Sequence, residues 1–232
     1  MPEQRVRKAV LPVAGLGTRF LPVTKSIPKE IMPLVDRPLI QYAIDEARAA
    51  GIEDFILVTS RGKSALEDYF DYAPALTDAL RRSGKTDLLE ELERTRMLSG
   101  SIAYVRQNEA RGLGHAVHCA ARLIGDEPFA VILPDDVIAA ETPCLKQMVD
   151  AHSDVGGNIV AAMEVPQSKV QAYGILDVAS ESAMARVRGM VEKPSPPAAP
   201  SNLAVIGRYI LTPDVLRRLA TQKPGAGGEI QL

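Results

Sequence analysis

The sequence has few cysteines, little net charge and no long apolar run, and each of these absences excludes a class of protein. Its two cysteines, Cys119 and Cys144, lie in different segments without the spacing of a metal site. The net charge of −2 leaves no general basic surface for nucleic acid. No apolar run is long enough to span a bilayer, and the N-terminus leads directly into a strand and a glycine loop, unlike a signal peptide. We therefore expect a cytoplasmic protein with reduced thiols and no nucleic-acid or membrane partner.

The chain is long enough for one α/β domain. Its 232 residues are 46% hydrophobic and 24% charged, as in an ordinary globular domain with a full core. Apolar runs predict strands at 8–13, 54–59, 102–106, 129–133, 158–164, 175–178, 187–191 and 204–211. Helical spacing predicts helices at 38–50, 63–69, 115–123 and 144–151, with one or two surface helices over 75–96 and an exposed proline-rich loop over 194–200. This alternation predicts an α/β fold, a Rossmann-like three-layer sandwich with a mixed, mainly parallel central sheet.

A glycine loop with several cations follows the first predicted strand. Residues 14–19 read Ala-Gly-Leu-Gly-Thr-Arg, and Lys25 and Lys29 follow in the same loop. Glycine lets the backbone approach phosphate oxygens, Arg19 can bind two oxygens at once, and the lysines act as point charges. The loop lacks the Gly-Lys-Ser/Thr end of a Walker A motif, and Phe20 stands where the dinucleotide fingerprint needs a third glycine. It predicts a phosphate site of another kind, with a plain strand-to-loop turn as the alternative.

Carboxylate and amide side chains follow three other predicted strands. Asp135 and Asp136 come after an apolar strand and suit Mg²⁺, which prefers oxygen ligands, although a turn or capping aspartate is the alternative. Glu192 and Lys193 end another strand, and the proline that follows predicts an extended Lys193; a surface ion pair is the alternative there. The amide of Gln107 carries both a donor and an acceptor, as the O4 and N3–H edge of uracil requires.

No protein nucleophile is indicated by the sequence. It has no Ser-His-Asp or Cys-His pattern, and His115 and His118 have no third ligand at a metal-type spacing. Transfer of a phosphoryl-type group does not need such a nucleophile, because one substrate supplies its own.

The motifs taken together resemble those of the sugar-1-phosphate nucleotidyltransferases, and within them the bacterial UTP–glucose-1-phosphate uridylyltransferases. The resemblance covers nearly the whole chain, at residues 15–19, 21–22, 24–25, 28–30, 107, 112–117, 133–136, 173–174, 191–194, 201–204, 207–209 and from 225 onwards. It implies a single nucleotidyltransferase domain over 1–232, with a nucleotide-binding half at about 1–140 and a sugar-binding half at about 141–232. Chains of the family continue further, so the resemblance also implies that a C-terminal segment, with a second metal-binding aspartate and a further basic residue, is absent here.

The resemblance assigns roles to individual residues. It implies that the catalytic cations are Arg19, Lys29 and Lys193. The nucleotide would contact Ala14, Gly15, Leu16, Gly17, Thr18, Glu30, Gln107 and Gly112. The sugar would contact Asp136, Gly174 and Glu192, while Asp135 would hold Mg²⁺. For Asp136, a solvent-facing aspartate is the alternative.

The reaction implied by the resemblance is Mg²⁺-dependent transfer of the uridylyl group of UTP to glucose-1-phosphate, which gives UDP-glucose and pyrophosphate. A homodimer or homotetramer is implied as well. Three alternatives stay open at this point. The first is a thymidylyltransferase that uses dTTP, since the two bases differ by one methyl group. The others are a UDP-sugar binding module without catalysis and a glycosyltransferase, although the adjacent Asp135 and Asp136 do not match the spaced aspartates of glycosyltransferases.

Overall fold

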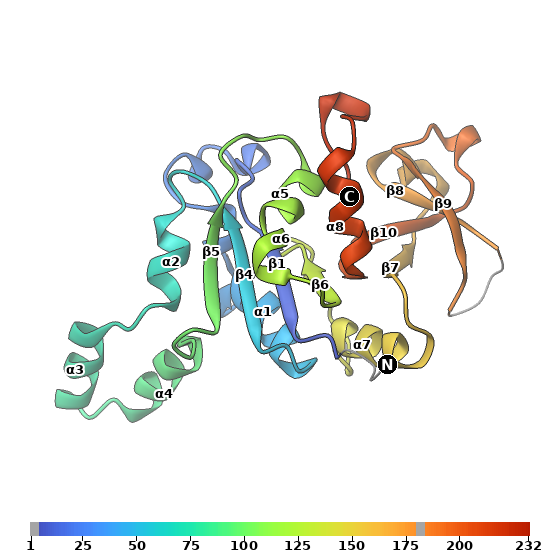
Figure 1. The fold of residues 1–232 in the computed structure, drawn as a ribbon. Helices are drawn as coiled ribbons and strands as arrows, with labels where there is room; N and C mark the ends of the chain where they lie inside the picture. Colours follow the sequence, from blue (N-terminus) through green and yellow to red (C-terminus); the bar gives the residue numbers. More distant parts are fainter. Residues whose placement is uncertain (1–4, 180–183) are drawn as a thin grey trace.

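One mixed β-sheet organises the molecule (Figure 1). The computed structural model describes residues 5–179 and 184–232. The strand order is β5-β4-β1-β6-β10-β8-β9, and β7 pairs with β10 beside this path. The strands are β1 (Lys8–Pro12), β4 (Asp54–Thr59), β5 (Ile102–Arg106), β6 (Phe129–Ile132), β7 (Ile159–Glu164), β8 (Gly174–Val178), β9 (Val187–Glu192) and β10 (Leu203–Leu211). A separate small sheet joins β2 (Pro33–Leu34) to β3 (Arg37–Pro38).

The sheet has a parallel part and an antiparallel part. Strands β5, β4, β1 and β6 run parallel, and Val10 in the middle lies opposite Ile56 on one side and Val131 on the other. Strand β10 is antiparallel to β6, β7 and β8, and β9 is antiparallel to β8. The predicted α/β fold with a mixed sheet and a parallel centre is therefore confirmed.

Helices connect the parallel strands and end where the sequence supplies a stop. The helices are α1 (Leu39–Ala49), α2 (Ser64–Phe70), α3 (Pro74–Arg82), α4 (Thr86–Thr95), α5 (Leu113–Cys119), α6 (Ala121–Ile124), α7 (Cys144–Val155) and α8 (Pro213–Thr221). Gly51, with φ +84, follows α1 as expected, and Gly84, with φ +66, separates α3 from α4. The single helix expected over 115–123 is divided, because the N–H of Ala120 donates to Val117 O and tightens the turn there.

Short 3₁₀ turns occupy much of the remaining chain. They are η1 (Thr18–Phe20), η2 (Val23–Lys25), η3 (Lys29–Ile31), η4 (Gln167–Ala172), η5 (Pro196–Ala198) and η6 (Ala226–Gly228). The expectation of a plain loop over 194–200 needs a correction at η5. Proline already has the backbone angle of a helical first turn, so a single 3₁₀ turn forms there.

Two apolar cores lie on opposite faces of the parallel strands. Along β1, Ala9 and Leu11 pack on the side of α1 and α7, whereas Val10 packs on the side of α5 and α8. The side chains of strand β6 alternate in the same way, with Ile132 on the face of α1 and α7 and Phe129 on the face of α5 and α8. This alternation is the two-residue period of a strand, and it requires helices on both faces of the sheet. The three-layer arrangement follows from it.

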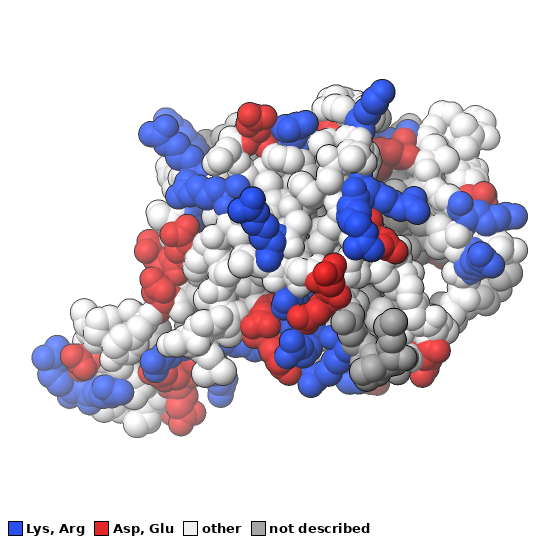
Figure 2. Space-filling model, in the orientation of Figure 1, with Lys and Arg blue, Asp and Glu red and all other residues white. Residues whose placement is uncertain are grey.

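The surface carries charges of both signs. Figure 2 shows lysine and arginine side chains interspersed with aspartate and glutamate on the face seen in Figure 1. None of the helices within the described ranges combines the length and apolar character needed to cross a membrane.

A buried ion pair connects the antiparallel part of the sheet to the helices behind it. Arg208 of β10 donates from Nε to Glu46 Oε1 at 3.0 Å and from Nη2 to Glu46 Oε2 at 2.7 Å. Its Nη1 donates to Leu133 O at 3.0 Å and to Gly207 O at 3.1 Å. The N–H of Leu145, at the start of α7, also donates to Glu46 Oε1. The pair therefore joins α1, α7, β10 and the end of β6 through satisfied polar groups.

Substitution of Arg208 by methionine should lower the free energy of unfolding by about 3–5 kcal/mol, because it leaves the Glu46 carboxylate buried without its partner. The side chains of Arg208 and Glu46 are 2% and 9% exposed. Urea unfolding followed by circular dichroism measures the change. The matched control is Arg188→Met, whose exposed pair with Asp177 should contribute no more than about 1 kcal/mol. Equal effects of the two substitutions would contradict the role given to the buried pair.

Candidate active site

A cavity of about 500 Å³ opens at the carboxyl edge of the parallel strands. Three loops that follow strands β1, β5 and β6 line it, together with a segment near the C-terminus. The lining residues are Pro12, Ala14, Gly15, Leu16, Gly17, Thr18, Arg19, Lys29, Gln107, Ala110, Gly112, Leu113, Ala116, Leu133, Asp135 and Glu229. Open parallel α/β sheets bind ligands at this edge, because the carboxyl ends of neighbouring strands and their loops converge there.

The glycine loop is held in a conformation that requires glycine at one position. Gly17 has φ +66, in the left-handed region that favours glycine. A Cβ there would lie 3.1 Å from Thr24 Cγ2 and 3.3 Å from Lys29 Cβ, so the loop packs closely on both residues. Thr24 Oγ1 also donates to Gly17 O at 2.8 Å. Contacts with Thr24 and Lys29 therefore fix the conformation of the glycine loop, and Lys29 lies directly against it.

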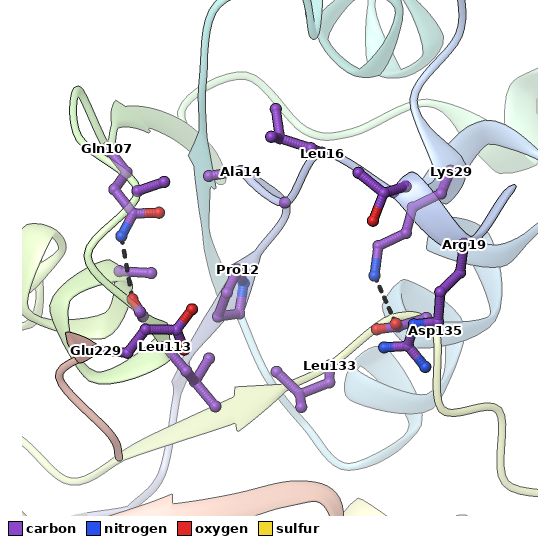
Figure 3. Close-up of a pocket in the computed structure, with 16 residues that line it drawn as sticks. Pro12, Ala14, Leu16, Arg19, Lys29, Gln107, Leu113, Leu133, Asp135 and Glu229 are labelled. Carbon is purple, nitrogen blue, oxygen red and sulfur yellow. Dashed lines mark hydrogen bonds and ion pairs between the residues drawn. The ribbon is translucent and has the colours of Figure 1, made fainter. Parts of the chain in front are cut away.

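Opposite charges gather at one end of the cavity. Lys29 Nζ lies 2.5 Å from Asp135 Oδ2, and the two side chains are 16% and 31% exposed. Figure 3 shows Arg19 beside this pair, with all three side chains at the same end. Among the described residues Arg19 has no carboxylate partner. This end offers two cations and one carboxylate to a ligand, which suits a polyphosphate and its counter-ion.

The amide of Gln107 lies at the other end of the cavity (Figure 3). Its Nε2 donates to Gly112 O at 3.1 Å and lies 3.0 Å from His115 Nδ1. The expectation that this amide offers both a donor and an acceptor to a base needs revision. Both hydrogens of Nε2 are directed at protein atoms, so the group that remains for a ligand is the carbonyl oxygen Oε1.

Glu229 was not identified from the sequence, although it lines the cavity. Its segment is held by two backbone hydrogen bonds, from Ile230 N to Arg111 O and from Gly114 N to Ile230 O, both 2.8 Å. A Cβ at Gly112 would lie 2.7 Å from Ile230 O, and a Cβ at Gly114 would overlap the backbone oxygen of Gln231. Both glycines therefore allow the end of the chain to pass beside α5. The Gly-x-Gly spacing was the available signal, but it did not reveal which backbone approaches.

Five of the predicted site residues lie outside this cavity, namely Glu30, Asp136, Gly174, Glu192 and Lys193. Gly174 pairs with Glu192 across β8 and β9, and a Cβ at Gly174 would lie 3.1 Å from Glu192 Oε2. Lys193 Nζ lies 3.4 Å from Glu192 Oε1, and its side chain is 63% exposed. The expectation of an extended Lys193 is wrong, since its φ is +48. Its N–H donates to Tyr173 O at 2.9 Å, and this bond turns the chain where β9 ends.

Asp136 contacts the neighbouring strand. Its Oδ2 accepts a hydrogen bond of 3.0 Å from Gly207 N, so this carboxylate joins the loop after β6 to β10. Burial, together with the negative charges of Asp136 and Glu192, raises the pKa of nearby Tyr209 to about 12. Tyr209 therefore stays protonated and able to donate near these two carboxylates. It is a further polar side chain of this region that the sequence did not single out.

Glu30 does not line the cavity, contrary to what its assignment to the nucleotide suggests. It is buried in η3, where Oε2 accepts a hydrogen bond of 2.8 Å from Lys63 Nζ. Lys63 lies directly before α2 and is buried as well. The pair joins η3 to the start of α2, and through η3 it supports the backbone that carries Lys29.

A model of the nucleotidyl transferase family matches residues 8–230. The chain therefore belongs to the nucleotidyl transferase family. A curated relative named UTP–glucose-1-phosphate uridylyltransferase, from Komagataeibacter xylinus, is 54% identical and is aligned over 98% of this chain and 80% of its own length. A relative of the same name from Bacillus subtilis is 52% identical over 99% of this chain and 78% of its own length.

Solved structures agree with this assignment. The structure of a UDP-glucose pyrophosphorylase complexed with UDP-glucose matches with a TM-score of 0.85 and 45% identity, over 97% of this chain and 83% of that chain. A candidate glucose-1-phosphate thymidylyltransferase from Bacillus anthracis matches with a TM-score of 0.73 but is 21% identical, and this likeness shows the fold alone.

Substitution of Gly114 by alanine should displace the segment that carries Glu229, because the new Cβ would overlap the backbone oxygen of Gln231. We expect a loss of about 1–3 kcal/mol in the free energy of unfolding, as for other overpacked sites. We also expect faster hydrogen exchange at the amide of Ile230. The control is Gly189→Ala, where a Cβ meets nothing within 4 Å. Unchanged exchange at Ile230 in Gly114→Ala would show that the segment does not depend on this approach.

Proposed function

We propose that this protein transfers the uridylyl group of UTP to glucose-1-phosphate and releases UDP-glucose and pyrophosphate. The observation that carries the proposal is that the two ends of the cavity differ in character. Arg19, Lys29 and Asp135 lie at one end and Gln107 lies at the other. The two ends of a nucleoside triphosphate differ in a matching way, since one is a neutral base and the other is a chain of anionic phosphates. The names of the relatives at about half identity support the same substrates.

The protein contributes position and charge to this reaction. A phosphate oxygen of glucose-1-phosphate attacks the α-phosphorus of UTP in line, and pyrophosphate leaves. The attacking phosphate is already anionic at neutral pH, so no general base is needed. Arg19 and the glycine loop hold the β- and γ-phosphates, and Lys29 stabilises the negative charge of the triphosphate. Lys193 approaches from the β8–β9 side, where it neutralises the two phosphates that must meet.

The residues of the cavity fit a Mg²⁺ ion that is bound together with the nucleotide. Mg²⁺ is usually held by one or two carboxylates, substrate phosphates and waters. Asp135 supplies one partly exposed carboxylate at the charged end, already paired with the cation Lys29. Across the described residues no group of three or more His, Cys, Asp or Glu side chains is placed to hold a metal without a substrate. When bound, Mg²⁺ would polarise the α-phosphate and screen its charge.

The sugar is assigned to the group around β8 and β9. Gly174 leaves room beside Glu192, and the Glu192 carboxylate would accept hydrogen bonds from sugar hydroxyls. Asp136 supports this group through Gly207, and Tyr209 offers a donor close to it. This placement agrees with a nucleotide-binding half at about 1–140 and a sugar-binding half at about 141–232, which we retain as a proposal.

The location and assembly of the protein are proposed from its resemblance to the family. A cytoplasmic location is supported by the thiols of Cys119 and Cys144, which are both free. A homodimer or homotetramer is the assembly proposed, and sedimentation equilibrium of the purified protein tests it.

Pyrophosphate release tests the reaction itself. The purified protein is mixed with glucose-1-phosphate, Mg²⁺ and either UTP or dTTP, and release is followed by a coupled assay. We expect release that needs both substrates and favours UTP. A preference for dTTP would indicate a thymidylyltransferase. Binding of UDP-glucose without any release would indicate a binding module.

Replacement of Asp135 by asparagine should lower Mg²⁺-dependent turnover by at least about 100-fold, because a neutral amide is a poor ligand for a divalent cation. The rate of pyrophosphate release over a range of Mg²⁺ concentrations measures this effect. Asp126→Asn is the control, since that side chain is 96% exposed and lies outside the cavity. An Asp135→Asn enzyme with normal turnover would remove this residue from the metal site.

Replacement of Lys193 by alanine should reduce kcat by about 100-fold or more, because the two reacting phosphates would repel each other without this cation. The unfolding midpoint should stay near that of the unmodified protein, since the side chain is mostly exposed. Lys169→Ala, an exposed lysine in η4 of the same region, is the control and should keep normal turnover. Normal kcat in Lys193→Ala would show that another group neutralises the phosphates.

A further inference from the structure

The orientation of the Gln107 amide is determined by the protein. Nε2 lies 3.1 Å from Gly112 O, which is an acceptor, so the nitrogen and not the oxygen must face that carbonyl. The second hydrogen of Nε2 is directed at His115 Nδ1 at 3.0 Å. Reversal of the amide would place Oε1 against the Gly112 oxygen and would require the His115 ring proton to move to Nδ1. The amide therefore has one stable orientation, in which both of its hydrogens are used.

His115 accepts this hydrogen bond from a position behind the cavity. It belongs to α5 and does not line the cavity, whereas Gln107 does. Because Nδ1 is the acceptor, the ring proton resides on Nε2, which lies 3.9 Å from Cys119 Sγ. Burial lowers the pKa of His115, and the positive charge of Arg111 and then His118 lowers it further, while Glu109 opposes this change. The neutral ring is the form that can accept from Gln107.

The carbonyl oxygen of Gln107 is left for a ligand. Figure 3 shows Oε1 directed toward the interior of the cavity while Nε2 is bonded to Gly112 O. No other side chain or backbone N–H of the described residues donates to Oε1. The base end of the cavity thus presents a hydrogen-bond acceptor, and a bound base must bring a donor to it.

We propose that His115 is a positioning residue that sets which pyrimidine the cavity accepts, by holding Gln107 with Oε1 toward the base. Uracil and thymine carry a donor at N3–H, which pairs with this oxygen. Cytosine carries an acceptor at N3, which would face the oxygen unless the amide reversed, at the cost of its bond to Gly112 O and of a shift of the His115 ring proton to Nδ1. The inference rests on the proposed function, in that the base is placed at the Gln107 end. It separates uracil from cytosine and does not separate uracil from thymine.

Variants at His115 distinguish this role from simple packing. Leucine has a side chain of comparable size but no hydrogen-bond acceptor. Asparagine can place an amide oxygen at about the position of Nδ1. His118→Leu is the control on the same helix, because Nδ1 of His118 is buried without a hydrogen-bond partner. The measurement is kcat/KM for UTP and for CTP at saturating glucose-1-phosphate.

We expect His115→Leu to narrow the preference for UTP over CTP by about fivefold, the value of one hydrogen bond. The change should appear in KM for UTP and not in KM for glucose-1-phosphate. His115→Asn and His118→Leu should keep the preference of the unmodified protein. An unchanged preference in His115→Leu, or an equal loss in His115→Leu and His115→Asn, would overturn the proposal.

A failure of the proposed function is recognised separately. If the unmodified protein releases no pyrophosphate from UTP, the reaction is wrong, and the role of His115 is then measured by binding. Calorimetric affinities for UMP and CMP should differ in the unmodified protein and approach each other by the same factor in His115→Leu. Equal affinities for UMP and CMP in the unmodified protein would overturn the inference itself.

Discussion

Parallel pairing of β5, β4, β1 and β6 is the constraint on which the rest of this structure depends. It requires crossover helices, and the two-residue alternation along β1 and β6 buries one apolar set under each helical layer. The same pairing makes the strands end at one edge, where loops from distant parts of the sequence form one cavity. The nucleotide end of the proposed reaction is thus a consequence of how the sheet is connected.

The antiparallel strands need a separate connection to this edge, and Arg208 provides it. Its guanidinium pairs with Glu46 behind the sheet and donates to the carbonyl of Leu133, two residues before Asp135. Burial of two charges is unfavourable, but here nearly every polar atom of the pair has a partner. Asp136 forms a second connection through Gly207 N. The proposed metal ligand is therefore held by the strand that leads to the proposed sugar region.

The proposed function assigns the two ends of the cavity two different tasks in the recognition of a nucleotide. At the charged end, Arg19 and Lys29 supply positive charge that would attract any triphosphate. The carboxylate of Asp135 partly neutralises this positive charge. At the other end, Gln107 and His115 form a neutral pair whose hydrogen bonds leave one acceptor for the base. Charge attracts the class of ligand, and the direction of a few hydrogen bonds selects within that class.

Local sequence patterns determined most of the secondary structure, the α/β class and the loops that carry Arg19, Lys29, Gln107 and Asp135, because strand and helix periods and glycine turns are short-range properties. Long-range contacts decided the rest. Lys193 adopts φ +48, Glu30 is buried against Lys63, and Glu229 reaches the cavity beside Gly112. The direction of the Gln107 amide belongs to the same group. No local pattern identifies the partner in any of these features, since each arises from an atom that only folding brings near, and that is why the tertiary structure was needed to see them.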